Sequence, residues 1–342
     1  MKTRNSIRIL AAVLGTAITS LTAAPVIHEP FAQTAGAING KPASATGLTG
    51  NWTLTAGTVN VVNPDTITHG ALAYSGGQVD VLSSGNTGAR VTRNADLATA
   101  GLLNDGATLW FSMVFQKTAG GGSNEHSGFA LGSSHLTAGA SGVALAASGN
   151  ALGFYVRDTA VRVVNWTGTA NVVQTSGVAG PTLSAYSTPT ILVGKIEWGA
   201  TASDVEKITL YQPNLNLSSL GTAFTLSTVP AFDQTTLNTI SFAQRNSSGT
   251  YTFDEIRFGA TQADVLPADT VAPTLLSITD NMAGGPIGED VAEVTYTLTF
   301  DEHMDISTIT AADFDNAGTA TATVGTITQV SPAVISVKLL PT

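Results

Sequence analysis

The strongest constraint on the fold of this chain is a long series of short apolar–polar alternations separated by Gly, Asn and Ser turns. Alternation with period two is typical of β-strands, and about a dozen such segments follow one another before residue 260. Residues 108–117 form the most apolar of these segments. Residues that favour helices are scarce, since only 11% of the chain is charged. The sequence therefore predicts an all-β sandwich or barrel.

The composition excludes several kinds of site. The chain has no cysteine, so disulfides, thiolate nucleophiles and zinc–thiolate centres are excluded. Its formal net charge is −10 over 342 residues, which disfavours nucleic acid and anionic membranes as partners and is compatible with cation binding. Four of the few basic residues, Arg90, Arg93, Arg157 and Arg162, lie in predicted strands, where we expect exposed side chains.

The N-terminus has the features of a secretory signal peptide. Lys2, Arg4 and Arg8 precede a short apolar run over residues 9–21, which small residues follow. A membrane anchor is the alternative, but the apolar run is shorter than the roughly 20 residues that a spanning helix needs. We therefore predict a cleaved signal peptide over residues 1–24, secretion or display at the cell surface, and no membrane span after cleavage.

Two motifs at opposite ends of the first predicted domain resemble a known family. Near the start, Glu29 precedes a Gly-rich segment that leads to Trp52. Near the end, Asp254-Glu-Ile-Arg-Phe-Gly is followed by a run of small residues and by Asp-Val-Leu-Pro. Both motifs resemble the secreted concanavalin A-like, laminin-G-like jelly-roll domains of environmental bacteria. The resemblance implies an antiparallel jelly-roll β-sandwich over residues 25–267 of a bacterial extracellular protein.

A second pattern begins after this domain. Residues 268–273 have the composition of a linker, and residues 293–300 then alternate strictly between apolar and polar side chains. The segment 274–342 resembles the bacterial immunoglobulin-like repeats of surface and secreted proteins. Such a sandwich usually has seven strands in about 100 residues, whereas about four strand patterns are visible here. We therefore expect an incomplete immunoglobulin-like domain and a longer natural protein.

The jelly-roll resemblance implies one metal site. Domains of this family often hold a structural Ca²⁺ where the first and last strands meet, and Glu29 and Asp254 stand on those strands here. Calcium prefers several oxygen ligands, including carboxylates and backbone carbonyls. The alternative is that Asp254 hydrogen-bonds to loop backbone and that Glu29 is solvated. No Asp-x-Asp-x-Asp-Gly loop is present, and the five histidines show no metal-ligand spacing.

Four tryptophans, Trp52, Trp110, Trp166 and Trp198, are candidates for stacking on sugar rings. Trp110 and Trp198 lie in apolar strands and Trp52 follows the Gly-rich opening, so we expect these three in the core. Trp166 ends a predicted strand before Thr-Gly-Thr and is expected to be the most exposed. Burial in the core is favoured for each of the four, and Trp166 is the candidate for a ligand platform.

The sequence contains no recognisable catalytic motif. Jelly-roll glycosidases use paired acidic residues that flank the glycosidic bond, and no alternating acidic set occurs before residue 267. Asp254 and Glu255 are adjacent on one predicted strand, so alternation places them on opposite faces. The Gly-x-Ser-x-Gly motif of serine hydrolases is absent. We therefore expect no enzymatic activity.

Three functions remain open at this level. The first is a non-catalytic binding or adhesion module whose concave sheet face and end loops contact a polysaccharide, a surface glycan or another extracellular polymer. The second is a structural spacer within a large surface protein. The third is a divergent polysaccharide hydrolase or lyase, which needs a cleft with two facing carboxylates.

Overall fold

A computed structural model describes most of the chain. The described residues are 24–43, 46–67, 72, 76–81, 85–93, 96–117, 126–139, 142–157, 160–168, 175–182, 189–214, 217, 219–247, 250–266, 274–283, 291–301, 304, 306, 309–314, 322–331 and 333–341. The predicted signal peptide therefore lies outside the described residues except for Ala24, and the predicted linker lies outside them entirely.

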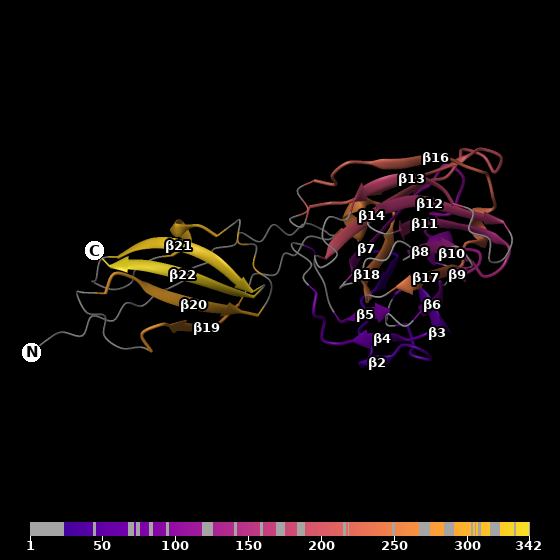
Figure 1. Ribbon diagram of the computed structural model, residues 1–342. Helices are drawn as coiled ribbons and strands as arrows, with labels where there is room; N and C mark the ends of the chain where they lie inside the picture. The colour runs from indigo at the N-terminus through magenta and orange to yellow at the C-terminus, as the bar shows by residue number, and fades with distance from the viewer. Residues whose placement is uncertain are drawn as a thin grey trace, which may run out of the picture. The chain divides into compact units, whose positions relative to one another are not determined.

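The described chain is built from antiparallel β-sheets (Figure 1). Its contacts divide it into two compact units, of which one spans Leu21–Ala268 and the other includes Asp269–Thr342. Every strand pairing within the described residues is antiparallel. The prediction of an all-β fold is confirmed.

The larger unit contains a nine-stranded sheet with the order β16-β15-β14-β7-β18-β5-β4-β2, in which β1 also pairs with β18. Its strands are β1 (Ile27–Glu29), β2 (Gly36–Ala37), β4 (Val59–Val62), β5 (Gln78–Val81), β7 (Thr108–Lys117), β14 (Thr190–Glu197), β15 (Glu206–Tyr211), β16 (Phe224–Val229) and β18 (Tyr251–Gly259).

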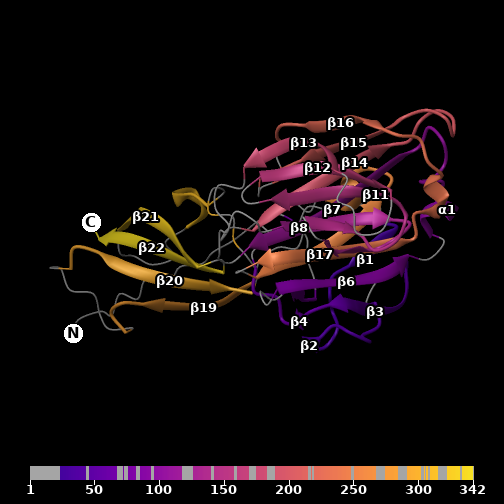
Figure 2. The same cartoon turned by 45° about the vertical axis from the view of Figure 1, so that its right-hand side comes forward.

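A seven-stranded sheet with the order β13-β12-β11-β8-β17-β6-β3 forms the second layer (Figure 2). Its strands are β3 (Leu48–Ala56), β6 (Gly85–Arg93), β8 (His126–Gly132), β11 (Gly149–Arg157), β12 (Ala160–Gly168), β13 (Thr175–Thr182) and β17 (Thr239–Ser247). A separate hairpin joins β9 (Leu136–Gly139) to β10 (Gly142–Leu145).

Helical structure in the described part of the chain is limited to single turns. These are α1 (Asp96–Thr99), η1 (Gln234–Thr236), α2 (Gln262–Val265) and η3 (Ala311–Asp313). None of the described helices has the length and apolar character needed to cross a membrane.

The main core lies between the two sheets. Phe115 of β7 meets Phe154 of β11 edge-on, with ring centroids 5.9 Å apart. Phe242 of β17 stacks on Phe253 of β18 at 4.9 Å. Aromatic side chains of both sheets are thus fully buried against each other, and each contributes roughly 1.5–3 kcal/mol by leaving water. This packing confirms the predicted two-sheet jelly-roll sandwich.

The closing strand β18 contains a bulge. Its register with β7 shifts just after Asp254, and Glu255 has a left-handed φ of 51°. Around the bulge the core-facing side chains are therefore Phe253, Ile256 and Phe258. Asp254 and Glu255, which lie between Phe253 and Ile256, both point away from the core. The prediction that Asp254 and Glu255 point to opposite faces is wrong, because a bulge interrupts the period-two alternation.

The smaller unit contains a four-stranded sheet with the order β19-β20-β22-β21. The strands are β19 (Leu275–Asp280), β20 (Val294–Phe300), β21 (Ala322–Ser331) and β22 (Val334–Pro341). Alternate residues of β20 are buried, as predicted, and pack against apolar residues of β22 such as Ile335 and Val337. The assignment of this sheet to an immunoglobulin-like domain stays a prediction.

Candidate functional site

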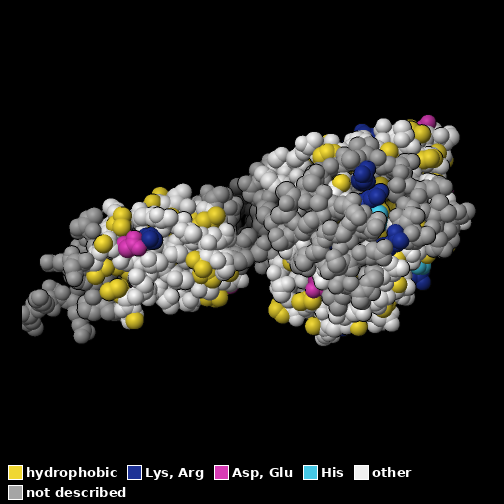
Figure 3. All heavy atoms as spheres, viewed as in Figure 1, with side chains coloured by type: hydrophobic (Ala, Val, Ile, Leu, Met, Phe, Trp, Pro, Cys, Tyr) yellow, Lys and Arg dark blue, Asp and Glu magenta, His cyan; other side chains and the backbone are white. Residues whose placement is uncertain are grey.

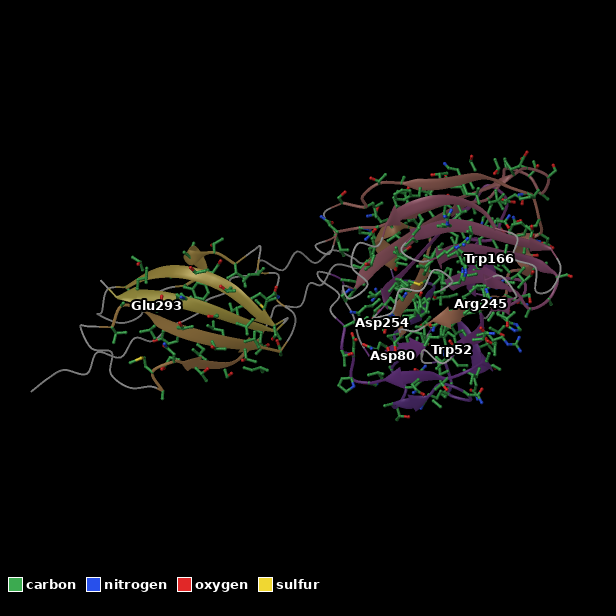
Figure 4. All side chains as sticks on the ribbon, viewed as in Figure 1. Trp52, Asp80, Trp166, Arg245, Asp254 and Glu293 are labelled. Atoms are coloured by element: carbon green, nitrogen blue, oxygen red, sulfur yellow. The ribbon has the colours of Figure 1, made fainter. Side chains whose placement is uncertain are left out.

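The outer face of the seven-stranded sheet carries a set of basic side chains. We call this set the cationic face and define it as Arg90 of β6, His126 of β8, Arg157 of β11, Arg162 of β12 and Arg245 of β17. Figure 3 shows Lys and Arg side chains in a line across one face of the larger unit, with a His between them. Figure 4 labels Arg245 and Trp166 on this sheet.

Strand alternation places these side chains on one side of the sheet. In β11, Leu152 and Phe154 face the main core. Tyr155 alternates with them, so it faces the other side of the sheet, where it belongs to a separate outer cluster. Arg157 has the same parity as Tyr155 and therefore also faces outward. The same argument holds for the other strands, because the outer cluster includes alternate residues of β8, β12 and β17.

The strand register brings three basic residues into one row. Arg157 lies directly opposite His126, and His126 lies directly opposite Arg245 on its other side. Directly opposed residues of neighbouring antiparallel strands project to the same face and are near neighbours. In the next row Arg162 lies opposite Tyr155. Basic groups from four adjacent strands thus gather at one end of the sheet.

His126, the middle residue of this row, forms a buried pair with Tyr155. The Tyr155 hydroxyl and His126 Nδ1 are hydrogen-bonded, and the two rings stack with centroids 5.3 Å apart. Trp166 meets the Tyr155 ring edge-on at 6.4 Å. Tyr155 is 4% exposed and His126 is 3% exposed, so neither ring faces solvent.

The β9–β10 hairpin covers the other end of the same face. Leu136, Val143 and Leu145 of the hairpin pack into the outer cluster with Trp166. The Trp166 indole N–H donates to the Val143 carbonyl at 3.1 Å, and its side chain is 1% exposed. The expectation that Trp166 is the most exposed tryptophan, and so a candidate platform, is wrong, because strand alternation alone does not reveal a hairpin folded over the sheet. The favoured interpretation, burial, is the one that the structure shows.

The remaining tryptophans differ from each other. Trp52 and Trp198 are buried in the main core, as predicted. Trp110 was predicted to be in the core but is only partly buried, since it lies on the outer face of the nine-stranded sheet. There it stacks on Tyr211 with ring centroids 6.1 Å apart, and the Lys195 ammonium lies 5.8 Å from its ring.

The arginines predicted as exposed also separate into two groups. Arg90 and Arg157 are exposed and Arg162 is half-buried on the cationic face. Arg93 is buried instead, and its Nε–H donates to the Leu237 carbonyl at 2.5 Å. Burial and the positive charge of Arg90 lower the pKa of His135, which precedes the hairpin, so this histidine is neutral at neutral pH.

Acidic side chains are absent from the whole sheet that bears the cationic face. None of its seven strands, as bounded above, contains Asp or Glu. Within the described part of the chain, the side chains of Arg90, Arg162 and Arg245 make no hydrogen bond or ion pair. The cationic face therefore retains donors that an external ligand can use.

Glu29, one of the two predicted calcium ligands, is fully buried. Its carboxylate accepts hydrogen bonds from the Trp52 indole N–H at 2.9 Å, from the Phe31 backbone N–H at 2.9 Å and from Gln33 at 3.3 Å. These donors use most of the roughly four acceptor positions of a carboxylate. The alternative that Glu29 is solvated is wrong, and the donor set fits a structural hydrogen-bond acceptor better than a calcium ligand.

Asp254, the second predicted ligand, lies in the bulge of β18. It accepts the backbone N–H of Glu255 at 2.7 Å, and burial together with the charges of Glu255 and Asp65 raises its pKa well above the ordinary value. Glu255 is paired with His28 at 2.6 Å and with Arg257. Among the described residues no group of three or more His, Asp or Glu side chains is arranged to hold a metal. Calcium binding stays a prediction.

Sequence reasoning missed His126, Tyr155 and Arg245 as members of one site. Their strands are separated by more than 80 residues at the extreme, and the strand order β11-β8-β17 is needed to bring them together. One signal was present in the sequence. Residues 126–157 and 159–196 contain no acidic residue, although the whole chain has 24.

Comparisons with known proteins give only distant likenesses. No protein-family model matches the chain, and no curated protein is significantly similar to it. A protein of unknown function from Shewanella oneidensis MR-1 aligns over 74% of this chain and 94% of its own, with 14% identity and a TM-score of 0.39. The Emp46p carbohydrate recognition domain aligns over 61% and 88%, with 10% identity and a TM-score of 0.35.

A third likeness is to the endo-β-1,4-glucuronan lyase of the fungus Trichoderma reesei. It aligns over 60% of this chain and 92% of its own, with 12% identity and a TM-score of 0.34. The solved structures that resemble the chain thus include both a carbohydrate recognition domain and a polysaccharide lyase. At these TM-scores the likenesses say nothing about what this chain binds.

Proposed function

We propose that the larger unit is a non-catalytic binding module for a glycan or related extracellular polymer, and that the cationic face is its binding surface. The observation that carries the proposal is that Arg157 and Arg245 flank the buried His126 in one row across three neighbouring strands, with Arg162 in the next row. A row of long donor side chains on a sheet face suits an extended ligand that crosses the strands. The signal-like N-terminus supports a location outside the cell.

Two observations support the non-catalytic part of the proposal. The third hypothesis, a hydrolase or lyase, needs reactive groups that a bound chain can reach. Tyr155 and His126 are acid–base groups of this face, and both are buried and bonded to each other. No carboxylate lies on the strands of this sheet to serve as a second acid or base.

The test is a binding screen of the full chain against an array of polysaccharides, run once with calcium and once with a chelator. We expect binding to at least one polymer. Loss of binding on chelation would support the proposed calcium at Asp254, whereas binding in both conditions would leave the cationic face without a metal requirement. No binding by a folded sample would favour the spacer and overturn the proposal.

The same samples distinguish binding from cleavage. Each polymer that binds is incubated with the protein, and new reducing ends and unsaturated sugars are measured. We expect neither product above the level of a blank without protein. Products that disappear in Tyr155→Phe would establish a lyase and overturn the non-catalytic part of the proposal.

A further inference from the structure

The cationic face stands out against the charge of the rest of the protein. The chain as a whole has a formal net charge of −10, yet the strands of one sheet carry only basic charged residues. Segregation of this kind creates a local positive potential, which acidic side chains placed among the basic ones would cancel. A surface that needed only solubility would gain from acidic neighbours, as the other sheet has.

The pairing of the basic residues supports the same conclusion. On the nine-stranded sheet Lys195 and Lys207 pair with Glu197 at 2.9 and 2.8 Å, and Arg257 pairs with Glu255. On the cationic face Arg162 and Arg245 have no partner among the described residues. A guanidinium without an internal partner keeps its full set of donors for an external anion.

We infer that the ligand of the cationic face is an acidic polysaccharide. This inference rests on the proposed function and narrows its ligand from glycans in general to acidic ones. Arginine binds carboxylates and sulfates through paired, charge-assisted hydrogen bonds. Arg157 and Arg245 are two strands apart, so their backbones lie about 10 Å from each other. Arg162 lies in the next row, opposite Tyr155, and Arg90 lies farther along the sheet, opposite Ser241. This spacing suits charges that recur along an extended sugar chain.

The wide spacing of the arginines also favours an acidic polysaccharide over nucleic acid as the ligand. Double-stranded DNA carries one negative charge about every 1.7 Å. A few arginines on a chain of net charge −10 do not offset that density. A polysaccharide with one acidic group per sugar or per disaccharide has a lower charge density, which the cationic face can match without a large basic surface.

The experiment compares polymers that differ only in charge. The full chain is titrated with polygalacturonate and its fully methyl-esterified form, and with dextran sulfate and unmodified dextran. We expect binding to at least one acidic polymer to be at least about tenfold tighter than binding to its neutral counterpart, with log K falling as log salt rises. The two acidic polymers distinguish carboxylate from sulfate as the recognised group.

Variants locate the effect on this face. Arg162→Gln/Arg245→Gln is expected to weaken acidic binding by about tenfold or more and to reduce the salt slope. Lys195→Gln/Lys207→Gln removes the same charge from the other sheet and is expected to leave binding unchanged. Equal weakening by both double variants would show non-specific charge attraction and overturn the assignment to the cationic face.

The outcomes separate the inference from the proposed function. Equal affinity for charged and neutral forms would overturn the acidic ligand while leaving a glycan-binding module in place. Binding to no polymer would overturn both. Tighter binding to duplex DNA than to every polysaccharide would also overturn the inference. The comparison of charged and neutral polymers uses the unaltered protein, so it decides the question even where a variant fails to fold.

Discussion

The two sheets of the larger unit use charge in opposite ways. The nine-stranded sheet carries acids and bases together, and two of its buried ions, Glu255 and Arg257, are paired with each other. The seven-stranded sheet carries bases alone, and Arg162 and Arg245 lie unpaired within its described residues. Paired ions inside a sheet hold a structure together, whereas unpaired ions on its outer face are suited to a ligand.

The difference also appears in the backbone. Asp65, Asp254 and Glu255 form an acidic cluster at a bulge of β18, in which Glu255 takes a left-handed φ of 51°. Arg157, His126 and Arg245 pair in a continuous register across β11, β8 and β17 and none of them has a positive φ, although the register of β17 with β6 shifts between Gln244 and Ser247. A non-glycine residue in this conformation costs roughly 1–3 kcal/mol, which the surrounding ion pairs and hydrogen bonds must offset. The cationic face has no comparable local cost.

The largest expected effect comes from breaking the buried ion pair. Arg257→Gln leaves the buried Glu255 carboxylate without its guanidinium partner, and we expect the free energy of unfolding to fall by about 3–5 kcal/mol. Urea denaturation followed by tryptophan fluorescence measures it. The matched control is Lys207→Gln, which removes an exposed partner of Glu197 and should cost less than about 1 kcal/mol. Equal losses of unfolding free energy in both variants would show that the buried ion pair stabilises the fold no more than the exposed one.

The outer cluster under the hairpin gives the next effect. Trp166→Ala removes a fully buried ring and its hydrogen bond to Val143, so we expect a loss of about 3–5 kcal/mol. Trp110→Ala serves as the control and should cost less than about 2 kcal/mol, because its ring is partly exposed. Thermal unfolding of both variants measures the contrast. A small loss of stability in Trp166→Ala, together with impaired glycan binding, would support Trp166 as a ligand platform after all.

The acidic cluster also predicts a dependence on pH. Burial and the nearby Glu255 charge raise the pKa of Asp65 from its ordinary value of 3.8 to about 6, and the pKa of Asp254 moves in the same direction. The folded state then binds more protons than the unfolded state between these values. The free energy of unfolding should therefore fall as pH rises from 3.8 to about 6, and Asp65 adds no further change above that.

Asp65→Asn isolates this contribution. The amide keeps an oxygen that can accept the Ile67 backbone N–H, which Asp65 accepts at 2.8 Å, but it does not titrate. We expect the variant to be more stable than the parent at pH 7, and the difference to shrink as pH falls below about 6. Arg257 faces the same cluster and stays charged across this range. A difference that is constant from pH 4 to pH 7 would contradict the raised pKa.

Much of the fold could be predicted from the sequence, because strand periodicity is local. The alternation over residues 108–117 matches β7, and the motif at the end of the first domain matches β18. The cationic face could not be predicted, because it depends on which strands become neighbours. Arg157 and Arg245 meet His126 only through pairings that join distant parts of the chain. Such long-range pairings leave no trace in local periodicity.

The smallest expected effect tests the contrast between the sheets most directly. Arg162 and Arg245 make no internal ion pair in the described structure, so Arg162→Gln and Arg245→Gln should each change the free energy of unfolding by less than about 0.5 kcal/mol. Arg157 lies in the same row, so loss of Arg245 also relieves repulsion between like charges and can give a slight gain at low salt. Chemical denaturation at low and high salt measures this. A loss above about 2 kcal/mol in either variant would show that these arginines stabilise the fold, as the paired ions of the nine-stranded sheet do.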